Sequence, residues 1–325
     1  MAGGQERILR RRIRSIRSTQ KITKAMELIA ASQIVRAQGR IAASKPYQRG
    51  MARIVLETAL GDPNAAGRLL GTPEEVNRVL VLCVVADRGL CGGYNTSVFR
   101  TTERLLAAQA ADGVESRLVT VGKKAVGYFR FRGQEVERSF LGMSERPTFA
   151  DAREVAAAAV TPFVNGEVDQ VLVVSTRFMS AGSQKVEVRQ LLPLEDPRNG
   201  EQKADHEHDV GSRDIAPHED DSKRGYTEFE PDAAILLVDL APRAAETEIF
   251  ASLLEASASE LTARQRAMAA ATDNAGELIK KYSRIMNRAR QDTITTEIME
   301  IVGGAEALRA GAEGDEGGLV IETRV

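Results

Sequence analysis

Apolar residues recur at helical spacing near the N-terminus of the chain. Their separations alternate between four and three residues in one trio, and a second trio repeats the rhythm one position over: Ile22, Met26, Ile29; Ile34, Ala37, Ile41. This spacing places a narrow apolar stripe on an otherwise charged helix. We therefore predict an N-terminal coiled-coil helix over residues 1–60, with Pro46 as the point where it kinks or ends.

A longer heptad pattern marks the C-terminal part. One set of residues repeats every seven positions and a second alternates steps of four and three: Leu261, Met268, Ala275, Tyr282, Ala289; Ala271, Ala275, Leu278, Tyr282, Ile285, Ala289. The pattern predicts a second coiled-coil helix over residues 232–309, and sixty residues of it would extend about 90 Å. Gly303 and Gly304 are expected to stop this helix. We predict a flexible tail over residues 310–325, which are rich in glycine and acidic residues.

Between these helices, strand and helix patterns alternate. Val79–Ala86 is a continuous apolar run, typical of a strand buried on both faces of a parallel sheet. Further strands are predicted at Arg117–Val121, Gln170–Phe178 and Gln184–Leu191, and helices at Thr96–Ala111, Lys123–Phe131 and Asp151–Val160, the last capped by Thr148. The alternation predicts a small α/β, Rossmann-like domain over residues 77–194.

The next segment differs in composition. Glu195–Asp221 contains ten acidic residues, three basic residues and all three histidines. It has too few apolar side chains to offset the entropy cost of ordering. We predict an acidic, mobile loop over residues 195–226.

The two terminal helices are predicted to pair with each other. Neither carries an apolar face wide enough to be stable alone. The expected fold class is therefore α/β, with a long antiparallel coiled coil of the N- and C-terminal helices beside a small Rossmann-like domain.

Charge is distributed unevenly along the chain. The net charge is -2, but residues 1–45 contain eleven Arg and Lys against Glu6 and Glu27, a balance of +9 that leaves about -11 for the rest. A basic end of this kind favours an acidic partner, which is nucleic acid, lipid headgroups or an acidic protein surface. The sequence contains no run of eighteen apolar residues, so we predict no transmembrane helix. The basic N-terminus lacks the apolar stretch of a signal peptide.

Nucleotide-binding motifs are missing from the α/β domain. Gly122-Lys123 is followed by Lys124 rather than Ser or Thr, so no P-loop is present. The glycines of Gly89–Gly93 do not have dinucleotide-binding spacing, and we interpret them as a tight loop. We expect no bound cofactor.

The candidate nucleophile and metal ligands are weak. Cys91 has no histidine in the folded parts to act as its base, so we interpret it as structural. Cys83 and Cys91 cannot supply a disulfide framework or a four-ligand zinc site. His206, His208 and His218 lie in the acidic loop, where at most weak metal binding is expected. The sequence therefore predicts no catalytic residue and no metal site.

Three blocks of the sequence, in order, resemble the gamma subunits of bacterial F-type ATP synthases. The blocks span nearly the whole chain: Arg12–Met26 with Ser32–Gln38; Asp87–Asn95; and Met268–Ile279, Asn287–Thr295 and Glu300–Ala305. The resemblance implies a central-stalk rotor, present once per complex, that couples ion flow through a membrane c-ring to conformational change at beta-subunit catalytic sites. It implies alpha, beta and epsilon subunits and the c-ring as partners, no nucleic acid, and a peripheral position on the cytoplasmic face of a bacterial plasma membrane.

The resemblance also assigns residues, position by position. It implies contacts with the alpha/beta head for Lys21, Lys24, Met26, Arg264, Arg290, Gln291 and Thr295. Residues Asp87, Arg88, Gly89, Cys91, Gly92 and Gly93 would form a structural motif loop. The acidic segment 195–221 is longer than is usual in the family and contains no cysteine, which excludes thiol regulation there and leaves another regulatory role as a hypothesis.

Two other classes of protein match parts of the sequence. A nucleic-acid-binding coiled coil would use residues 7–45 as a basic arm, but these basic residues interleave with an apolar seam instead of forming a free basic helix. A nucleotide enzyme with helical extensions would need a phosphate-binding motif. The pattern therefore favours a non-catalytic subunit.

Overall fold

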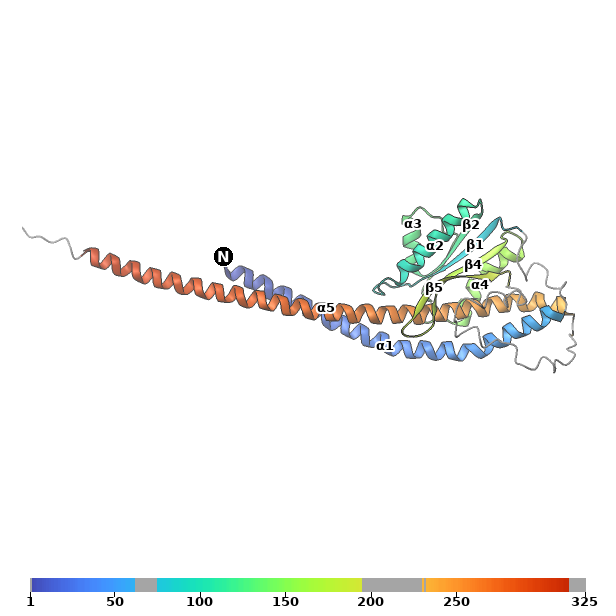
Figure 1. Cartoon of the computed structure of the whole chain (residues 1–325), viewed down its shortest axis with the longest axis horizontal. Coiled ribbons are helices and arrows are strands. Elements are labelled where there is room, and N and C mark those ends of the chain that lie inside the picture. The colour runs from blue at the N-terminus through green and yellow to red at the C-terminus, as the bar shows by residue number, and fades with distance from the viewer. Residues whose placement is uncertain (1, 62–74, 195–229, 231, 316–325) are drawn as a thin grey trace, which may run out of the picture. The chain divides into compact units, whose positions relative to one another are not determined.

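The computed structural model describes residues 2–61, 75–194, 230 and 232–315. Its elements, in chain order, are α1 (Ala2–Gly61), β1 (Arg78–Val84), α2 (Tyr94–Ala111), β2 (Glu115–Val121), α3 (Lys123–Phe131), β3 (Arg138–Phe140), α4 (Phe149–Val164), β4 (Gln170–Phe178), β5 (Gln184–Leu192) and α5 (Ala233–Asp315) (Figure 1). The chain divides into two compact units, of which unit 1 comprises residues 1–26 and 269–325, and unit 2 comprises residues 27–268.

Unit 2 contains a five-stranded sheet with the order β3-β2-β1-β4-β5. Strands β3, β2, β1 and β4 are parallel, and β5 is antiparallel to β4. Strand β1 lies in the centre, and Leu80–Cys83 are completely buried because helices cover both faces of the sheet.

Alternate residues of β1 contribute to two separate cores. Leu80, Leu82 and Val84 pack in a core with residues of α4 and with Ala245, Ile249, Leu253 and Ala256 of α5. Val79, Val81 and Cys83 pack on the opposite face with residues of α2 and α3. Helix α5 therefore forms part of the α/β domain's own core, and this fixes the domain to the helix.

Helix α5 is covered on a second side by α1 within unit 2. Leu254, Ala258 and Leu261 of α5 form a core with residues of the N-terminal helix: Ile34, Ala37 and Ile41. A second contact joins Leu237 to Met51 and Val55. Since residue numbers rise along one helix as they fall along the other, the pair is antiparallel, as predicted.

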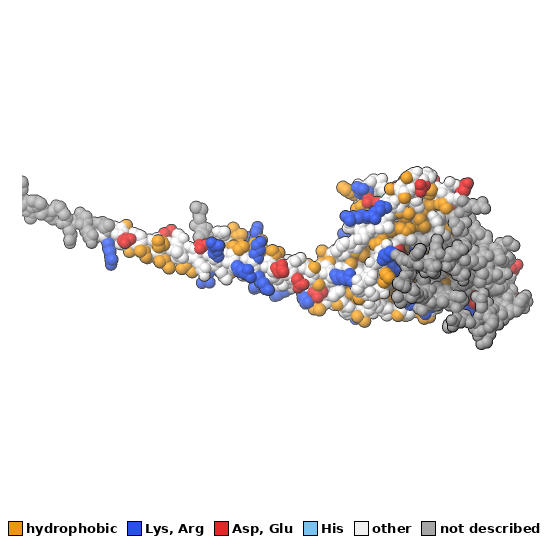
Figure 2. All heavy atoms as spheres, viewed as in Figure 1, with side chains coloured by type: hydrophobic (Ala, Val, Ile, Leu, Met, Phe, Trp, Pro, Cys, Tyr) orange, Lys and Arg blue, Asp and Glu red, His pale blue; other side chains and the backbone are white. Residues whose placement is uncertain are grey.

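The antiparallel pairing also holds within unit 1. Thr23 Oγ1 and Thr272 Oγ1 are 2.8 Å apart, and the Gln20 side-chain amide donates to the Thr272 carbonyl at 3.3 Å. Farther along, the Arg12 guanidinium lies 6.0 Å from the Tyr282 ring centroid. Figure 2 shows Lys and Arg side chains interleaved with apolar ones along this unit.

Two of the six positions predicted for the N-terminal seam are wrong. The second predicted trio, which begins at Ile34, is buried, but Ile22 and Ile29 of the first trio are each 58% exposed. The buried seam instead runs through Leu9, Ile13, Thr23 and Ala30, which keeps one register with Ile34, Ala37 and Ile41. The spacing of apolar residues did not indicate this seam, because one of its buried positions, Thr23, is polar and another, Ala30, has a small side chain.

The C-terminal seam is confirmed at most of its predicted positions. The predicted positions Met268 and Ala275 are buried, but Leu278 and Ile285 are 42% and 40% exposed. Tyr282 and Ala289 of the predicted heptad are half-buried, and so are Ile279 and Met286, each one residue after an exposed predicted position. The apolar stripe is wider than one seam, so spacing alone did not select the side that faces α1.

Both long helices pass through residues that were expected to stop them. Helix α1 continues through Pro46 to Gly61, and α5 contains Pro242 and continues through Gly303 and Gly304 to Asp315. Two glycines cost about 1 kcal/mol each relative to alanine, and the alanine-rich sequence after them is a strong helix former. Residues 310–315 of the predicted tail are therefore helical.

The strand and helix predictions for the α/β domain hold, and the Thr148 side chain caps α4 in a capping box with Asp151. Strand β3, only three residues long, was not predicted. The acidic segment 195–226, with His206, His208 and His218, lies outside the described residues, as do residues 316–325. Within the described residues, no helix is both long and apolar enough to cross a bilayer.

Candidate functional site

The loop that follows β1 is held by a carboxylate at its first position. Asp87 accepts hydrogen bonds from the backbone N–H groups of Lys123 at 2.9 Å, Gly142 at 3.0 Å and Ser144 at 3.1 Å. The Asp87 N–H donates in turn to Ser144 Oγ at 3.0 Å. Partial burial raises the pKa of Asp87, but these hydrogen bonds outweigh it and place the pKa below its ordinary value. Asp87 thereby ties together three loops at the carboxyl ends of β1, β2 and β3.

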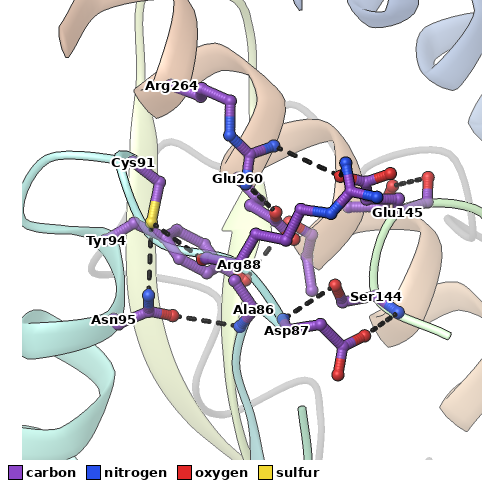
Figure 3. Close-up of polar contacts among 12 residues, drawn as sticks. Ala86, Asp87, Arg88, Cys91, Tyr94, Asn95, Ser144, Glu145, Glu260 and Arg264 are labelled. Carbon is purple, nitrogen blue, oxygen red and sulfur yellow. Dashed lines mark hydrogen bonds and ion pairs between the residues drawn. The ribbon is translucent and has the colours of Figure 1, made fainter. Parts of the chain in front are cut away.

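Arg88, the next residue, begins a chain of ion pairs that reaches helix α5 (Figure 3). Arg88 Nη1 lies 2.9 Å from Glu145 Oε1, and the same oxygen is 4.0 Å from Arg264 Nη1. Arg264 Nη2 lies 2.6 Å from Glu260 Oε1, one turn earlier on α5. The charges alternate in sign from the loop to the helix.

The inner end of this chain is excluded from solvent. The Glu260 and Arg264 side chains are 1% and 8% exposed. Burial raises the pKa of Glu260, and the attraction of Arg264 opposes but does not cancel this effect. Because a charge in such a site is stable only beside its partner, Glu260 holds the Arg264 guanidinium in place, and the contact of Arg264 with Glu145 joins α5 to the loop before α4.

The second half of the loop packs on the same stretch of α5. Asn95 donates to Cys91 Sγ at 3.2 Å and accepts from the Ala86 N–H at 3.0 Å, which bridges the two ends of the loop. The Tyr94 hydroxyl donates to the Ala256 carbonyl at 3.2 Å. Burial, followed by the charge of Glu260, raises the pKa of Cys91, so this thiol is not activated as a nucleophile.

Glycines in these loops have backbone conformations that other residues rarely adopt. Gly92 has φ +58°, and a Cβ there would lie 3.6 Å from the Ala267 side chain on α5. Gly122 has φ +104°, and a Cβ would lie 2.2 Å from the Val85 carbonyl oxygen. Gly89 and Gly93 have no such constraint, whereas Leu90 has φ 63°. Gly122 is therefore required by close approach of two loops rather than by a bound phosphate.

Taken together, these contacts form a junction between the α/β domain and helix α5. Its members come from the predicted loop and from residues that the sequence did not single out: Ser144, Glu145 and Glu260. The four-residue spacing of Glu260 and Arg264 was the available signal for that pair. Glu145 gave no signal, because it follows the short strand that was not predicted. We refer below to this group, Asp87–Asn95 with Ser144, Glu145, Glu260 and Arg264, as the junction.

The other predicted contact residues lie in unit 1, in two groups. Lys21 and Lys24 are exposed and Met26 is half-buried, on the part of α1 that pairs with α5 around Thr272. Arg290, Gln291 and Thr295 are exposed on α5. About twenty residues separate the groups along the paired helices, roughly 30 Å at helical rise. They do not form one site, and the contacts of all seven predicted residues stay a prediction.

No metal-binding arrangement occurs in the part of the chain that the structure describes. It contains no group of three or more His, Cys, Asp or Glu side chains placed to hold an ion. The Glu145 and Glu260 carboxylates of the junction are paired with arginines, and the Asp87 carboxylate accepts backbone N–H bonds. What this arrangement does is hold two structural elements together.

Comparisons with known proteins agree along the whole chain. A family model described as ATP synthase matches residues 5–308. The chain is 43% identical to the "ATP synthase gamma chain" of Frankia casuarinae, over 95% of the chain and 99% of that protein, and 46% identical to that of Acidothermus cellulolyticus, over 95% and 98%.

Solved structures show the same fold at low identity. A chain of the mitochondrial ATP synthase of Euglena gracilis, in an OSCP/F1/c-ring structure, is 19% identical with a TM-score of 0.64, and the match covers 99% of both chains. A chain of the Tetrahymena thermophila mitochondrial ATP synthase, from a structure of its central stalk and c-ring, is 21% identical with a TM-score of 0.56, over 77% of this chain and 99% of that one.

Proposed function

The chain belongs to the family of ATP synthase gamma chains, and on this basis we propose that it is the central-stalk rotor subunit of a bacterial F-type ATP synthase. In this role it couples ion flow through a membrane c-ring to conformational change at catalytic sites on beta subunits. The proposed partners are the alpha, beta and epsilon subunits and the c-ring. The observation that carries the proposal is that helix α5 belongs both to the antiparallel helix pair and to the core of the α/β domain.

Continuity of helix α5 supports a mechanical role. A rotor must transmit torque between distant partners, and α5 is one uninterrupted helix from Ala233 to Asp315. Each exposed ion pair with a partner contributes only about 0–1 kcal/mol. By comparison, one charge crossing 100 mV releases about 2.3 kcal/mol. We infer that work passes through many weak contacts and through the stiffness of the paired helices.

The junction supplies the attachment that such a rotor requires. Torque that enters at the α/β domain reaches α5 through buried side chains and through the Arg88–Glu145–Arg264–Glu260 series. A buried ion pair resists displacement because separation leaves an unpaired charge in a site of low dielectric. Arg264 is so enclosed that its primary role in this proposal is to hold the junction.

Exposed residues of unit 1 supply the proposed contacts with the head. We infer that Lys21 and Lys24 face acidic loops of the beta subunits. Closer to the C-terminal end of α5, three further residues are inferred to contact the head: Arg290, Gln291 and Thr295. Beyond the region paired with α1, α5 exposes a series of apolar side chains that a surrounding head would cover: Ile294, Ile298, Met299, Ile301, Val302 and Leu308.

We further propose that the subunit is itself non-catalytic and is located on the cytoplasmic face of the plasma membrane, held there through the complex. A buried thiol with a raised pKa and the absence of a P-loop sequence around Gly122 support the first part. The bacterial gamma chains to which the chain is similar support the second.

Reconstitution tests this function directly. The purified chain is mixed with alpha and beta subunits from the same source, and ATP hydrolysis is measured for the mixture and for the chain alone. Both native cysteines are buried, so a cysteine introduced at the exposed Ala111 is a selective attachment point for a bead. We expect a complex that hydrolyses ATP and turns the bead in one direction when ATP is present. Failure to assemble, or hydrolysis without rotation, would overturn the proposal.

A further inference from the structure

A pocket rich in arginine opens in unit 2 between α1, α5 and the loop that joins β3 to α4. Its volume is about 270 Å³, and it is lined by Gln33, Arg36, Arg40, Glu145, Arg146 and Leu261. Arg36 and Arg40 are one turn apart on α1, whereas Arg146 belongs to the loop. Three positive side chains from two separate parts of the chain therefore border one space.

Carboxylates do not neutralise this charge. Glu145 is the one acidic residue in the described lining, and its carboxylate already lies 2.9 Å from Arg88 and 4.0 Å from Arg264. Within the described residues, neither Arg36 nor Arg146 makes an ion pair or a hydrogen bond. Together with Glu260, the region contains five arginines and two carboxylates, which leaves an excess of three positive charges.

The pocket is preformed and its charges repel one another. The Glu145 carbonyl accepts from Ser257 Oγ at 2.8 Å and from Arg40 Nη2 at 3.5 Å, and these bonds hold the loop against both helices. Burial, and then the nearby charge of Arg146, lower the pKa of Arg40. Like charges held close together in this way favour the binding of an anion.

From this geometry we propose that the pocket binds a polyvalent oxyanion of the phosphate class. Each guanidinium offers paired N–H donors that match two phosphate oxygens. Three guanidinium groups supply more N–H donors than the two oxygens of one carboxylate can accept, which favours a phosphate over a carboxylate. The volume exceeds that of a single phosphate group, so a diphosphate occupies it better, with Leu261 as an apolar wall. The site goes beyond the proposed rotor function and does not depend on it.

Calorimetric titration of the full-length chain tests the site. The probes are sodium phosphate, sodium pyrophosphate and ADP, at constant ionic strength. We expect pyrophosphate to bind more tightly than phosphate. ADP binding tighter than pyrophosphate would identify a nucleotide as the source of the phosphate groups, and weaker binding would identify a free oxyanion; both outcomes support the site.

Matched arginine variants decide whether the pocket is responsible. Arg40→Gln and Arg146→Gln should each weaken pyrophosphate binding by about tenfold, the effect of losing one charge-assisted hydrogen bond. Arg53→Gln removes the same charge from the same helix outside the pocket and should change the affinity less than twofold. Because Arg146 is exposed, Arg146→Gln should fold normally, as thermal unfolding will show.

Three results would overturn the proposal. The first is no pyrophosphate binding by the wild-type chain. The second is equal weakening by Arg53→Gln, which would indicate general charge attraction. The third is that the wild-type chain and Arg146→Gln bind pyrophosphate equally well but differ in their assembly with alpha and beta subunits. That result would make the pocket a docking surface for an acidic protein segment.

Discussion

Glu260 and Arg264 form an ion pair at 2.6 Å on consecutive turns of α5, and both side chains are almost wholly buried at the junction (Figure 3). Charged side chains are seldom buried this fully unless they are paired with each other. Burial of this pair links the α/β domain to the long helix that continues beyond it. The first prediction therefore concerns this pair.

Removal of either partner should destabilise the protein strongly. Glu260→Gln leaves Arg264 enclosed without its nearest counter-charge, and we expect a loss of about 3 kcal/mol in the free energy of unfolding, measured with urea. The double variant Glu260→Gln with Arg264→Met should recover much of this loss, because no buried charge remains. Arg53→Gln breaks the exposed pair with Glu57 and should leave the free energy of unfolding nearly unchanged, because water screens this pair. Equal losses for the buried and exposed pairs would contradict this account.

Asp87→Asn should weaken the loop in a pH-dependent way. The carboxylate accepts three backbone N–H bonds, and an amide cannot replace both oxygens as acceptors, so we expect a loss of roughly 2 kcal/mol at pH 7. The pKa of Asp87 lies below its ordinary value in the folded state, so its stabilising effect is complete above the unfolded-state pKa. It is lost as the pH falls through the folded-state pKa.

Urea unfolding of wild type and Asp87→Asn at several pH values checks this prediction. The difference between the two should be constant from about pH 5 to 7 and should shrink below about pH 4. Asp112→Asn, at an exposed position after α2, serves as the control and should differ little from wild type at neutral pH. A difference that grows as the pH falls would refute the assignment.

Gly122→Ala should be among the most damaging single substitutions in the α/β domain. The new Cβ would lie 2.2 Å from the Val85 carbonyl oxygen, and the φ of +104° is unfavourable for alanine in addition. We expect a loss of more than about 3 kcal/mol, or little soluble protein. Gly127→Ala, in α3 with nothing near its Cβ position, should instead stabilise by up to about 1 kcal/mol. Thermal unfolding of both variants checks this prediction, and a Gly122→Ala chain as stable as wild type would contradict it.

The register of the coiled coil is tested by two isoleucines in α1. Ile34 is 8% exposed and Ile22 is 58% exposed, although the two had similar helical spacing in the sequence. Ile34→Ala should cost about 2–3 kcal/mol, whereas Ile22→Ala should cost less than about 0.5 kcal/mol. Measurement on the isolated chain avoids effects on assembly. Equal, large losses for the two variants would instead support the seam that the sequence pattern suggested, in which both isoleucines are buried.

Composition and periodicity were sufficient to predict the two long helices and the central strand of this protein. The heptad spacing indicated two helices that need each other, and the apolar run Val79–Ala86 indicated a central strand covered on both faces. Both follow from local rules, since helical and strand periods decide which side chains share a face. The motifs at the two ends and in the middle were sufficient for the family.

Tertiary structure alone decided the register, the helix ends and the junction. The heptad pattern could not show that Thr23 rather than Ile22 faces α5, because both lie near the edge of the same stripe and only packing against Thr272 selects one. Glu145 meets Arg88 and Arg264 although 57 and 119 residues separate it from them in the sequence. Such contacts arise from the way the sheet and the long helix are packed, a relationship between distant segments that no local spacing encodes.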